Sequence, residues 1–309
     1  HELYVSLLKP FETIFKGKHL LVVPVGPLAS LPLGVLVTAP MPVALPDGPA
    51  GYRAAAWLGR EVAMTVVPSV AGLAALRALP RSIRANKALL GFGNPLLDGD
   101  PGVPWQADRA RLAREKQSCP PAAPLRFASL LRWQRSVVPR TRGRVMDVED
   151  IRAQVALPET TDELCAVARS LGVTEADVRL GQRATEAEVR RMSKAGELAR
   201  YRVLHFATHG AMSGEIAGGA EPGLIFTPPA KASENDDGYL AASEIAQLRL
   251  NADWVILSAC NTGAGESAGA EALSGIARSF FYAGARTLLV SHWAVNSQST
   301  VRLITKAMA

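Results

Sequence analysis

The sequence predicts an α/β fold in which helices cover a mainly parallel sheet, and the second half of the chain gives the strongest indications. Residues Tyr201–Phe206 and Trp254–Leu257 are short apolar runs that end abruptly in small and polar residues, which is typical of buried strands. Patterns with helical spacing lie between strand-like runs. This alternation favours parallel strands joined by helical crossovers.

Residues 1–97 are expected to form the N-terminal part of the fold. Three runs that are bounded by turn residues predict strands at His19–Val23, Glu61–Val67 and Lys87–Phe92. Pro68–Leu79 predicts a helix, and Ser69 is a suitable residue to cap its first turn.

Residues 98–150 differ in composition and are expected to form a basic, proline-rich insertion loop. Between residues 101 and 144 there are ten Lys or Arg residues against two acidic ones, Asp108 and Glu115. The aromatic residues of this segment are scattered, so the pattern predicts a solvated, partly mobile loop rather than a nucleic-acid site. Any contact with nucleic acid would be indirect.

Residues 151–309 are expected to hold the catalytic core, and two helix starts can be read in its first part. Thr160 or Thr161 is predicted to cap a helix that runs to about residue 170. Thr185 and Glu188 have the spacing of a capping box, which predicts a helix over residues 186–199.

The remaining elements of this core follow from apolar runs and their boundaries. Short strands are expected at Asp177–Leu180 and Arg286–His292. Glu271–Ala283 has one apolar face and is followed by Gly284, which predicts a helix with a glycine at its C-terminal stop.

The cysteine content bears on the compartment. Cys119, Cys165 and Cys260 are an odd and sparse set that does not indicate a disulfide framework, and this suits a reducing cytoplasm. We therefore expect a cytoplasmic protein. No apolar run approaches the roughly 18–20 residues that a membrane helix needs, so we expect no membrane partner.

The sequence also gives expectations about cofactors and about the extent of the protein. His205 and His209 lie at a strand-to-loop junction and the cysteines are far apart, so the sequence predicts no metal site, and we expect no other cofactor. The first residue is His1 rather than Met, which indicates a segment of a longer protein.

Two residues with catalytic chemistry follow the two strand-like runs of the first paragraph. Tyr201–Phe206 leads into Ala207, Thr208, His209 and Gly210, and Trp254–Leu257 leads into Ser258, Ala259 and Cys260. The carboxyl ends of parallel strands are where ligands bind in an open sheet. An imidazole can take the proton of a thiol and return it to a leaving group, which is the chemistry of a cysteine nucleophile.

Five stretches carry a resemblance to a known family: LHFATHG (204–210), DDGYLAASEIAQL (236–248), WVILSACNTG (254–263), EALSGIARSFFYAGA (271–285) and LLVSHWAV (288–295). They resemble the CHAT domain family, a bacterial branch of the caspase-like, clan CD cysteine peptidases, related in fold to caspases and separase. The resemblance covers residues 150–305 well and 15–100 more loosely. It implies a caspase-like three-layer α/β/α sandwich.

The same resemblance implies roles for particular residues. His209 would be the general base and Cys260 the nucleophile of a cysteine endopeptidase, and the backbone amides of Gly210 and Cys260 would form the oxyanion hole. The implied partner is a protein or peptide substrate. Family members often carry helical repeats of the TPR type ahead of this domain, so an upstream repeat region or a sensor protein is a further expected partner.

The substrate pocket can be narrowed to a few residues. In caspase-like peptidases the pocket resembles a cleft between the two catalytic loops and the loop after the next strand, where Trp293 could form a wall. Glu215, Glu221, Asp236 and Asp237 lie in the polar segment between the histidine and cysteine strands and could attract a basic side chain at P1. For Asp236 and Asp237, Asp-Asp-Gly is also ordinary turn chemistry.

Three alternatives remain open. Gly265–Gly269 matches the G-x-S-x-G pattern of serine hydrolases, but Ser267 comes several residues after the strand rather than directly on its turn. Gly263, Gly265 and Ala268 imitate a nucleotide loop, yet no acidic residue follows at the expected position. The main rival to a peptidase is a catalytically silent interaction or scaffold module that keeps the same fold.

Overall fold

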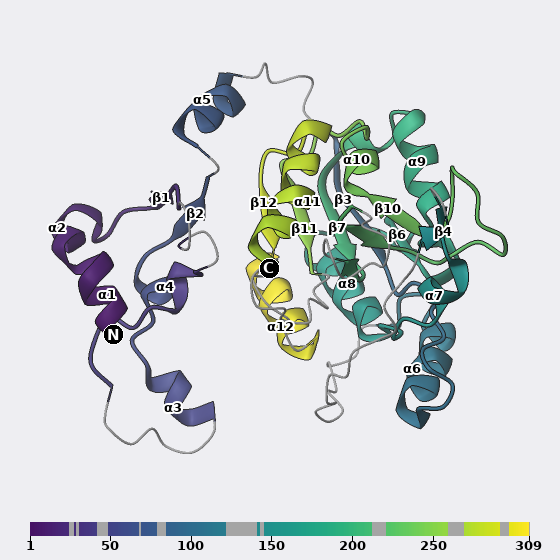
Figure 1. Ribbon diagram of the computed structural model, residues 1–309, viewed down its shortest axis with the longest axis horizontal. Helices are drawn as coiled ribbons and strands as arrows, with labels where there is room; N and C mark the ends of the chain where they lie inside the picture. Colours follow the sequence, from purple (N-terminus) through teal and green to yellow (C-terminus); the bar gives the residue numbers. More distant parts are fainter. Residues whose placement is uncertain are drawn as a thin grey trace. The chain divides into compact units, whose positions relative to one another are not determined.

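The computed structural model describes residues 1–24, 28, 31–41, 49–67, 69–78, 85–121, 141–142, 145–211, 221–258, 269–290 and 297–308. The chain forms two compact units, His1–Pro80 (unit 1) and Arg81–Ala309 (unit 2) (Figure 1). From the sequence, the N-terminal part of the fold was expected to end at residue 97. The units divide earlier because strand β3 (Lys87–Gly93) belongs to the central sheet of unit 2.

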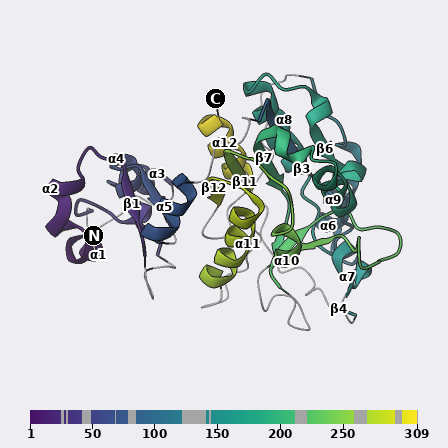
Figure 2. The same ribbon diagram turned by 90° about the horizontal axis from the view of Figure 1, so that it is seen from above.

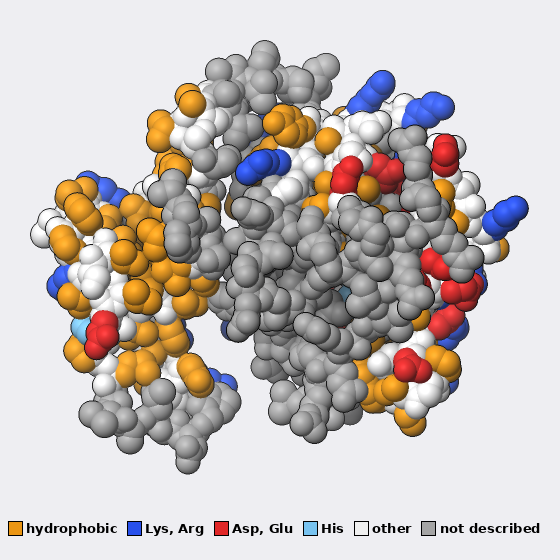
Figure 3. All heavy atoms as spheres, viewed as in Figure 1, with side chains coloured by type: hydrophobic (Ala, Val, Ile, Leu, Met, Phe, Trp, Pro, Cys, Tyr) orange, Lys and Arg blue, Asp and Glu red, His pale blue; other side chains and the backbone are white. Residues whose placement is uncertain are grey.

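Unit 1 is a small assembly of short elements. Its two strands pair in parallel, and its core contains Tyr4, Phe15 and Leu58. The Oγ of Ser69 accepts a hydrogen bond from the Gly72 amide at 2.8 Å, which confirms the predicted cap. Apolar side chains cover much of the surface of unit 1 (Figure 3). The described elements are α1 (Glu2–Leu7), α2 (Glu12–Phe15), β1 (Leu20–Val22), α3 (Pro49–Ala54), α4 (Leu58–Glu61), β2 (Met64–Val66), α5 (Val70–Ala78) and 3-10 turns at Lys9–Phe11 and Leu33–Val35.

Unit 2 is built on a five-stranded sheet in which every neighbouring pair is parallel. The order is β12-β11-β7-β3-β6. After β3 the chain adds β6 on one side of it, and then adds β7, β11 and β12 in turn on the other side. The strands other than β3 are β6 (Val178–Leu180), β7 (Tyr201–Ala207), β11 (Trp254–Leu257) and β12 (Leu288–Val290). The parallel α/β sheet predicted from the sequence is confirmed.

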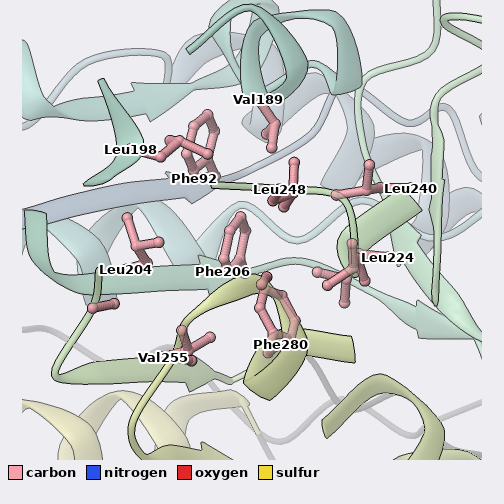
Figure 4. Close-up of a cluster of buried hydrophobic side chains, with 14 of the residues drawn as sticks. Phe92, Val189, Leu198, Leu204, Phe206, Leu224, Leu240, Leu248, Val255 and Phe280 are labelled. Atoms are coloured by element: carbon pink, nitrogen blue, oxygen red, sulfur yellow. The ribbon is translucent and has the colours of Figure 1, made fainter. Parts of the chain in front are cut away.

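Helices cover both faces of this sheet, which gives three layers (Figure 2). One face packs against α8 (Glu159–Ser170) and α12 (Ser297–Met308), the other against α9 (Glu186–Lys194), α10 (Ala242–Ile245) and α11 (Gly269–Ala283). On the second face, Phe206 stacks with Phe92 at a ring distance of 5.5 Å and meets Phe280 of α11 at 5.4 Å (Figure 4). The caspase-like α/β/α sandwich is thus the observed architecture.

Helix α8 lies unusually close to strand β3. A Cβ atom added at Gly91 would lie 2.8 Å from Leu164 Cδ2, and one added at Gly93 would lie 2.6 Å from Leu164 Cδ1. Side chains at these two positions would therefore push the helix outward. The two glycines fix where the start of α8 stands relative to the carboxyl end of the sheet.

The segment 98–150 is not simply a solvated loop, and this expectation is corrected for its described part. Pro104–Glu115 forms the three-turn helix α6, and Val148–Arg152 forms α7. Gln106, Ala110 and Ala113 of α6 are buried at spacings of four and three, which is one helical face. Two-residue strands β4 (Thr141–Arg142) and β5 (Val145–Met146) form a hairpin.

Two other expectations about helix ends have different outcomes. Thr185 caps α9 as predicted, because its side chain accepts a hydrogen bond from the Glu188 amide. Neither Thr160 nor Thr161 caps α8, which begins one residue earlier, at Glu159. Thr160 Oγ1 donates to the Leu157 carbonyl instead, so its hydroxyl is used inside the first turn.

The cysteine expectation is also wrong. Cys119 and Cys165 form a disulfide that joins the segment after α6 to the middle of α8. Their Cα atoms are 5.5 Å apart across 46 residues of sequence, a proximity that arises only in the folded chain. The cysteine pattern therefore no longer supports a reducing compartment. Among the described residues, no helix has the length and apolarity needed to cross a membrane.

Candidate active site

The two strands that lead to His209 and Cys260 are neighbours in the central sheet. Phe206 of β7 lies opposite Leu257 of β11 in parallel register. The pairing extends one step further, because the Ser258 amide donates to the Phe206 carbonyl at 3.2 Å. His209 and Cys260 each follow these paired residues by three positions, so both leave the sheet at the same edge. Cys260 itself lies outside the described residues.

His209 is buried and its ring is fixed by a backbone group. Its Nε2 lies 2.6 Å from the carbonyl oxygen of Val155, in the turn between α7 and α8. A carbonyl only accepts, so Nε2 carries the hydrogen and Nδ1 keeps the lone pair. Burial lowers the pKa of His209 below its ordinary value of 6.5, although the bond to Val155 opposes this. The imidazole is therefore neutral at pH 7, as a general base must be.

The backbone next to His209 is held by a small antiparallel sheet of β8 (Gly210–Ala211), β9 (Gly223–Ile225) and β10 (Tyr239–Ala241). The His209 carbonyl accepts from the Ile225 amide at 2.9 Å, and Gly210 is opposite Leu224. Bonded and non-bonded pairs alternate in such a ladder, so the Gly210 pair is non-bonded and its N–H is directed away from β9.

The turn that contains Val155 is held by hydrogen bonds from residues for which the sequence predicted no role. Arg109 of α6 donates through Nε to the Ala156 carbonyl at 2.8 Å and through Nη2 to both Glu159 carboxylate oxygens, at 2.7 and 2.6 Å. The signal that could have found α6 is the helical spacing of Gln106, Ala110 and Ala113, with a proline at the first turn.

A buried polar cluster lies where β11 ends, at Ser258, two residues before Cys260. His205 of β7 is fully buried, and its Nε2 is 2.9 Å from Glu163 Oε1 of α8 and 3.0 Å from Ser258 Oγ. Both partners face the same ring nitrogen, whereas a nucleophilic triad needs them on opposite nitrogens. The cluster therefore links α8, β7 and the first residue after β11.

The acidic residues that were predicted to line the substrate pocket differ from one another in their surroundings. Asp237 accepts hydrogen bonds from the amides of Met146 at 2.7 Å and Tyr239 at 3.0 Å, so its carboxylate supports the turn before β10. Burial raises the pKa of the neighbouring Asp236. Glu221 accepts from the Ser243 amide at 2.7 Å. Glu215 and Trp293 lie outside the described residues, as do Ser267 and the glycines of the nucleotide-like loop, and the pocket assignment stays a prediction.

Behind this turn lies a buried carboxylate, Glu186 of α9. Its Oε1 accepts from Arg190 Nε at 2.6 Å, and its Oε2 accepts from the amides of Asp237 and Gly238 at 2.9 and 3.1 Å. Burial raises the pKa of Glu186 to about 7, against the opposing effects of these donors. The folded protein therefore holds a proton here that the unfolded chain releases above about pH 4.5.

This raised pKa predicts a pH-dependent stability of unit 2. The contribution of Glu186 is fully present below about pH 4.5 and is lost as the pH rises through about 7. Relative to Glu186→Gln, which cannot ionise, the wild type should lose up to about 3 kcal/mol over this range. Urea denaturation of both proteins at several pH values between 4.5 and 7.5 measures the difference. Parallel pH profiles would contradict it.

No group of three or more His, Cys, Asp or Glu side chains suited to a metal ion occurs in the part of the chain that the structure describes. Around His209 the structure places a buried, neutral imidazole with a fixed tautomer and a glycine amide that is directed away from β9.

Comparison with protein families matches the CHAT domain model to residues 1–308. The chain belongs to the CHAT domain family. The resemblance inferred from the motifs is thereby confirmed, and the match spans both units and helix α6. This CHAT domain matches no curated protein and no solved structure. The family is related to caspase-like cysteine peptidases.

Proposed function

We propose that this CHAT domain is a cysteine endopeptidase in which His209 activates Cys260. The observation that carries the proposal is the register of β7 and β11: Phe206 and Leu257 are paired, and the histidine and the cysteine each follow by three residues. Equal offsets on adjacent parallel strands bring both loops to the same edge of the sheet. The buried, neutral His209 supports the same role.

In the first step the Sγ–H proton of Cys260 passes to Nδ1 of His209 as the sulfur attacks the carbonyl carbon of the scissile peptide bond. Nδ1 is the accepting atom because Nε2 already donates to the Val155 carbonyl. The imidazolium that forms is stabilised by that same bond. The Gly210 amide, together with that of Cys260, would bind the oxyanion of the tetrahedral intermediate.

In the second step the C–N bond breaks and His209 gives its proton to the departing amine, which leaves a thioester on Cys260. Water, deprotonated by His209, then attacks the thioester and releases the new carboxylate and the thiol. The sequence of steps needs no cofactor.

The substrate is proposed to be a protein or peptide. Asp236, Asp237, Glu215 and Trp293 are retained as proposed pocket residues, and a basic P1 side chain is the one that these carboxylates would favour. Asp237 accepts hydrogen bonds from two backbone amides, and Asp236 has backbone hydrogen bonds as well, with Gly238 and Ala187. An upstream repeat region or sensor protein is proposed as the regulator.

The proposal is tested with peptidyl acyloxymethyl ketones that carry arginine, aspartate or leucine at P1. With Cys119 and Cys165 paired, Cys260 is the remaining cysteine of the sequence, so labelling without reductant reports on it directly. Mass spectrometry should locate the label on Cys260, with arginine preferred, and Cys260→Ala should not react. Failure of all three probes on the wild type would favour the interaction-module alternative.

A further inference from the structure

The C-terminal end of helix α6 is tied to the start of α8, while the buried face of α6 packs in a separate hydrophobic cluster with Ile151, Ala156 and Ile225. Asn94, which follows β3 and is fully buried with a φ of 49°, donates through Nδ2 to the carbonyls of Ala113 and Lys116 at 2.8 and 2.9 Å. Its own amide donates to Thr160 Oγ1 of α8 at 2.8 Å. Asn94 therefore ties the end of α6 to the start of α8.

Further contacts repeat this connection. Thr161 Oγ1 donates to the Lys116 carbonyl at 2.8 Å, and Lys116 Nζ pairs with Asp162 at 2.6 Å. The disulfide between Cys119 and Cys165 adds a covalent link. A helix held by so many bonds is a rigid support for the side chains that it carries.

Arg109 extends from this support to the turn that holds the base. Its guanidinium binds the Ala156 carbonyl and both oxygens of Glu159, so it closes the short segment between them into one geometry. The side chains of Arg109 and Glu159 are only 16% and 18% exposed, and charge-assisted hydrogen bonds from Nη2 to both carboxylate oxygens hold the two partners together. Val155, whose carbonyl receives the His209 proton bond, immediately precedes this segment.

We propose that Arg109 is a positioning residue for the general base: by clamping Ala156 and Glu159 it holds the Val155 carbonyl against Nε2 of His209. The clamp makes α6, in the segment that the sequence marked as an insertion, a part of the active-site framework. Its catalytic consequence rests on the proposed peptidase function. The effect of Arg109 on the position of the His209 ring does not depend on that function.

A positional role and a purely electrostatic one predict different results. The Arg109 cation lowers the pKa of His209 and the Glu159 anion raises it. If only charge mattered, Arg109→Met and Glu159→Gln would shift this pKa in opposite directions and leave the hydrogen bond intact. If Arg109 positions the turn, both variants weaken the bond, and Arg109→Lys fails to restore it because the single nitrogen of lysine cannot replace both Nε, which bonds the Ala156 carbonyl, and Nη2, which bonds Glu159.

The first readout is the Nε2–H signal of His209 in ¹H–¹⁵N spectra of the full chain, assigned by its absence in His209→Gln among only five histidines. We expect a protected signal in the wild type that is lost or exchange-broadened in Arg109→Met, Arg109→Lys and Glu159→Gln. The matched control is Arg111→Met, on the same helix, where Arg111 is exposed and pairs with Asp108 and Glu115. Thermal unfolding checks that each variant is folded.

The second readout is the rate at which the peptidyl acyloxymethyl ketone labels Cys260. Misplacement of a base by about 1 Å costs up to about 10²-fold, so we expect a 10- to 100-fold loss in folded Arg109→Met and Arg109→Lys and none in Arg111→Met. A retained His209 signal with an unchanged pKa in these variants overturns the inference. If the wild type is not labelled at all, the proposed function fails, while the spectra still decide whether Arg109 positions the imidazole.

Discussion

Replacing His209 by alanine should lower the rate of Cys260 labelling by a peptidyl acyloxymethyl ketone by about 10²–10⁴-fold at pH 7. The expected loss is large because, among the described residues, His209 follows β7 by the same offset at which Cys260 follows the paired strand β11 in the sequence. The matched control is His19→Ala, which removes an exposed histidine of unit 1 that bonds Thr65.

The pH profile gives the same prediction a second, independent form. Burial holds the pKa of His209 below 6.5, so the wild-type rate should fall only as the pH drops below this value and should be level by about pH 7. In His209→Ala this acid limb should vanish, and the rate should rise instead toward the pKa of an ordinary thiol, about 8.5. A His209→Ala protein that keeps the wild-type profile would remove histidine from the mechanism.

The strands that carry the site could be predicted because their sequence signal is local. Tyr201–Phe206 and Trp254–Leu257 are apolar runs with abrupt ends, and strands that are buried on both faces read in this way. The cap at Thr185 is local in the same sense, since the hydroxyl and the amide that it binds are three residues apart.

Helix α6 was not predicted, because the prediction for residues 98–150 rested on their charge and not on the spacing of the residues that are buried. Arg111 and Arg114 occupy the solvated side, while Gln106, Ala110 and Ala113 form a narrow buried face made of small or polar residues. A helix whose buried face contains alanine rather than leucine has a weak hydrophobic pattern. The disulfide that follows this helix has no local signal at all, since its cysteines are 46 residues apart in the sequence and meet only in the folded chain.

The group that orients the His209 ring could not be predicted from the sequence either, because it is not a side chain. Its partner is the carbonyl of Val155, and every residue except the chain end offers the same atom. Glu163 is a related case: a glutamate in a helix is normally exposed, yet this one is 2% exposed beneath the sheet. Only the close approach of α8 to Gly91 and Gly93 brings it to His205.

This buried pair leads to the largest expected loss of stability. Replacing His205 by leucine should leave the buried Glu163 side chain without the imidazole nitrogen that lies 2.9 Å from its Oε1. Removing one partner of a buried polar pair costs about 1–3 kcal/mol, and about 3–5 kcal/mol where a charge is left behind. The loss should be concentrated in β7 and β11, since His205 and Ser258 lie on or directly after these strands.

Because the chain has two compact units, the measurement must report on unit 2 alone. Hydrogen exchange of peptides from β7 and β11, followed by mass spectrometry, gives the local free energy of opening. The matched control is Arg202→Leu on the same strand, where Arg202 forms an exposed ion pair with Asp253. Its removal should cost less than about 1 kcal/mol.

The double variant His205→Leu with Glu163→Leu separates a paired cluster from two independent core residues. Replacing both members of a buried pair by apolar side chains is often neutral, so the double variant should regain most of the stability that His205→Leu loses. Additive losses would show that the two side chains do not depend on each other. If the double variant is stable but labels Cys260 more slowly than the wild type, the cluster also holds Ser258 and the loop that carries the nucleophile, since Ser258 precedes Cys260 by two residues.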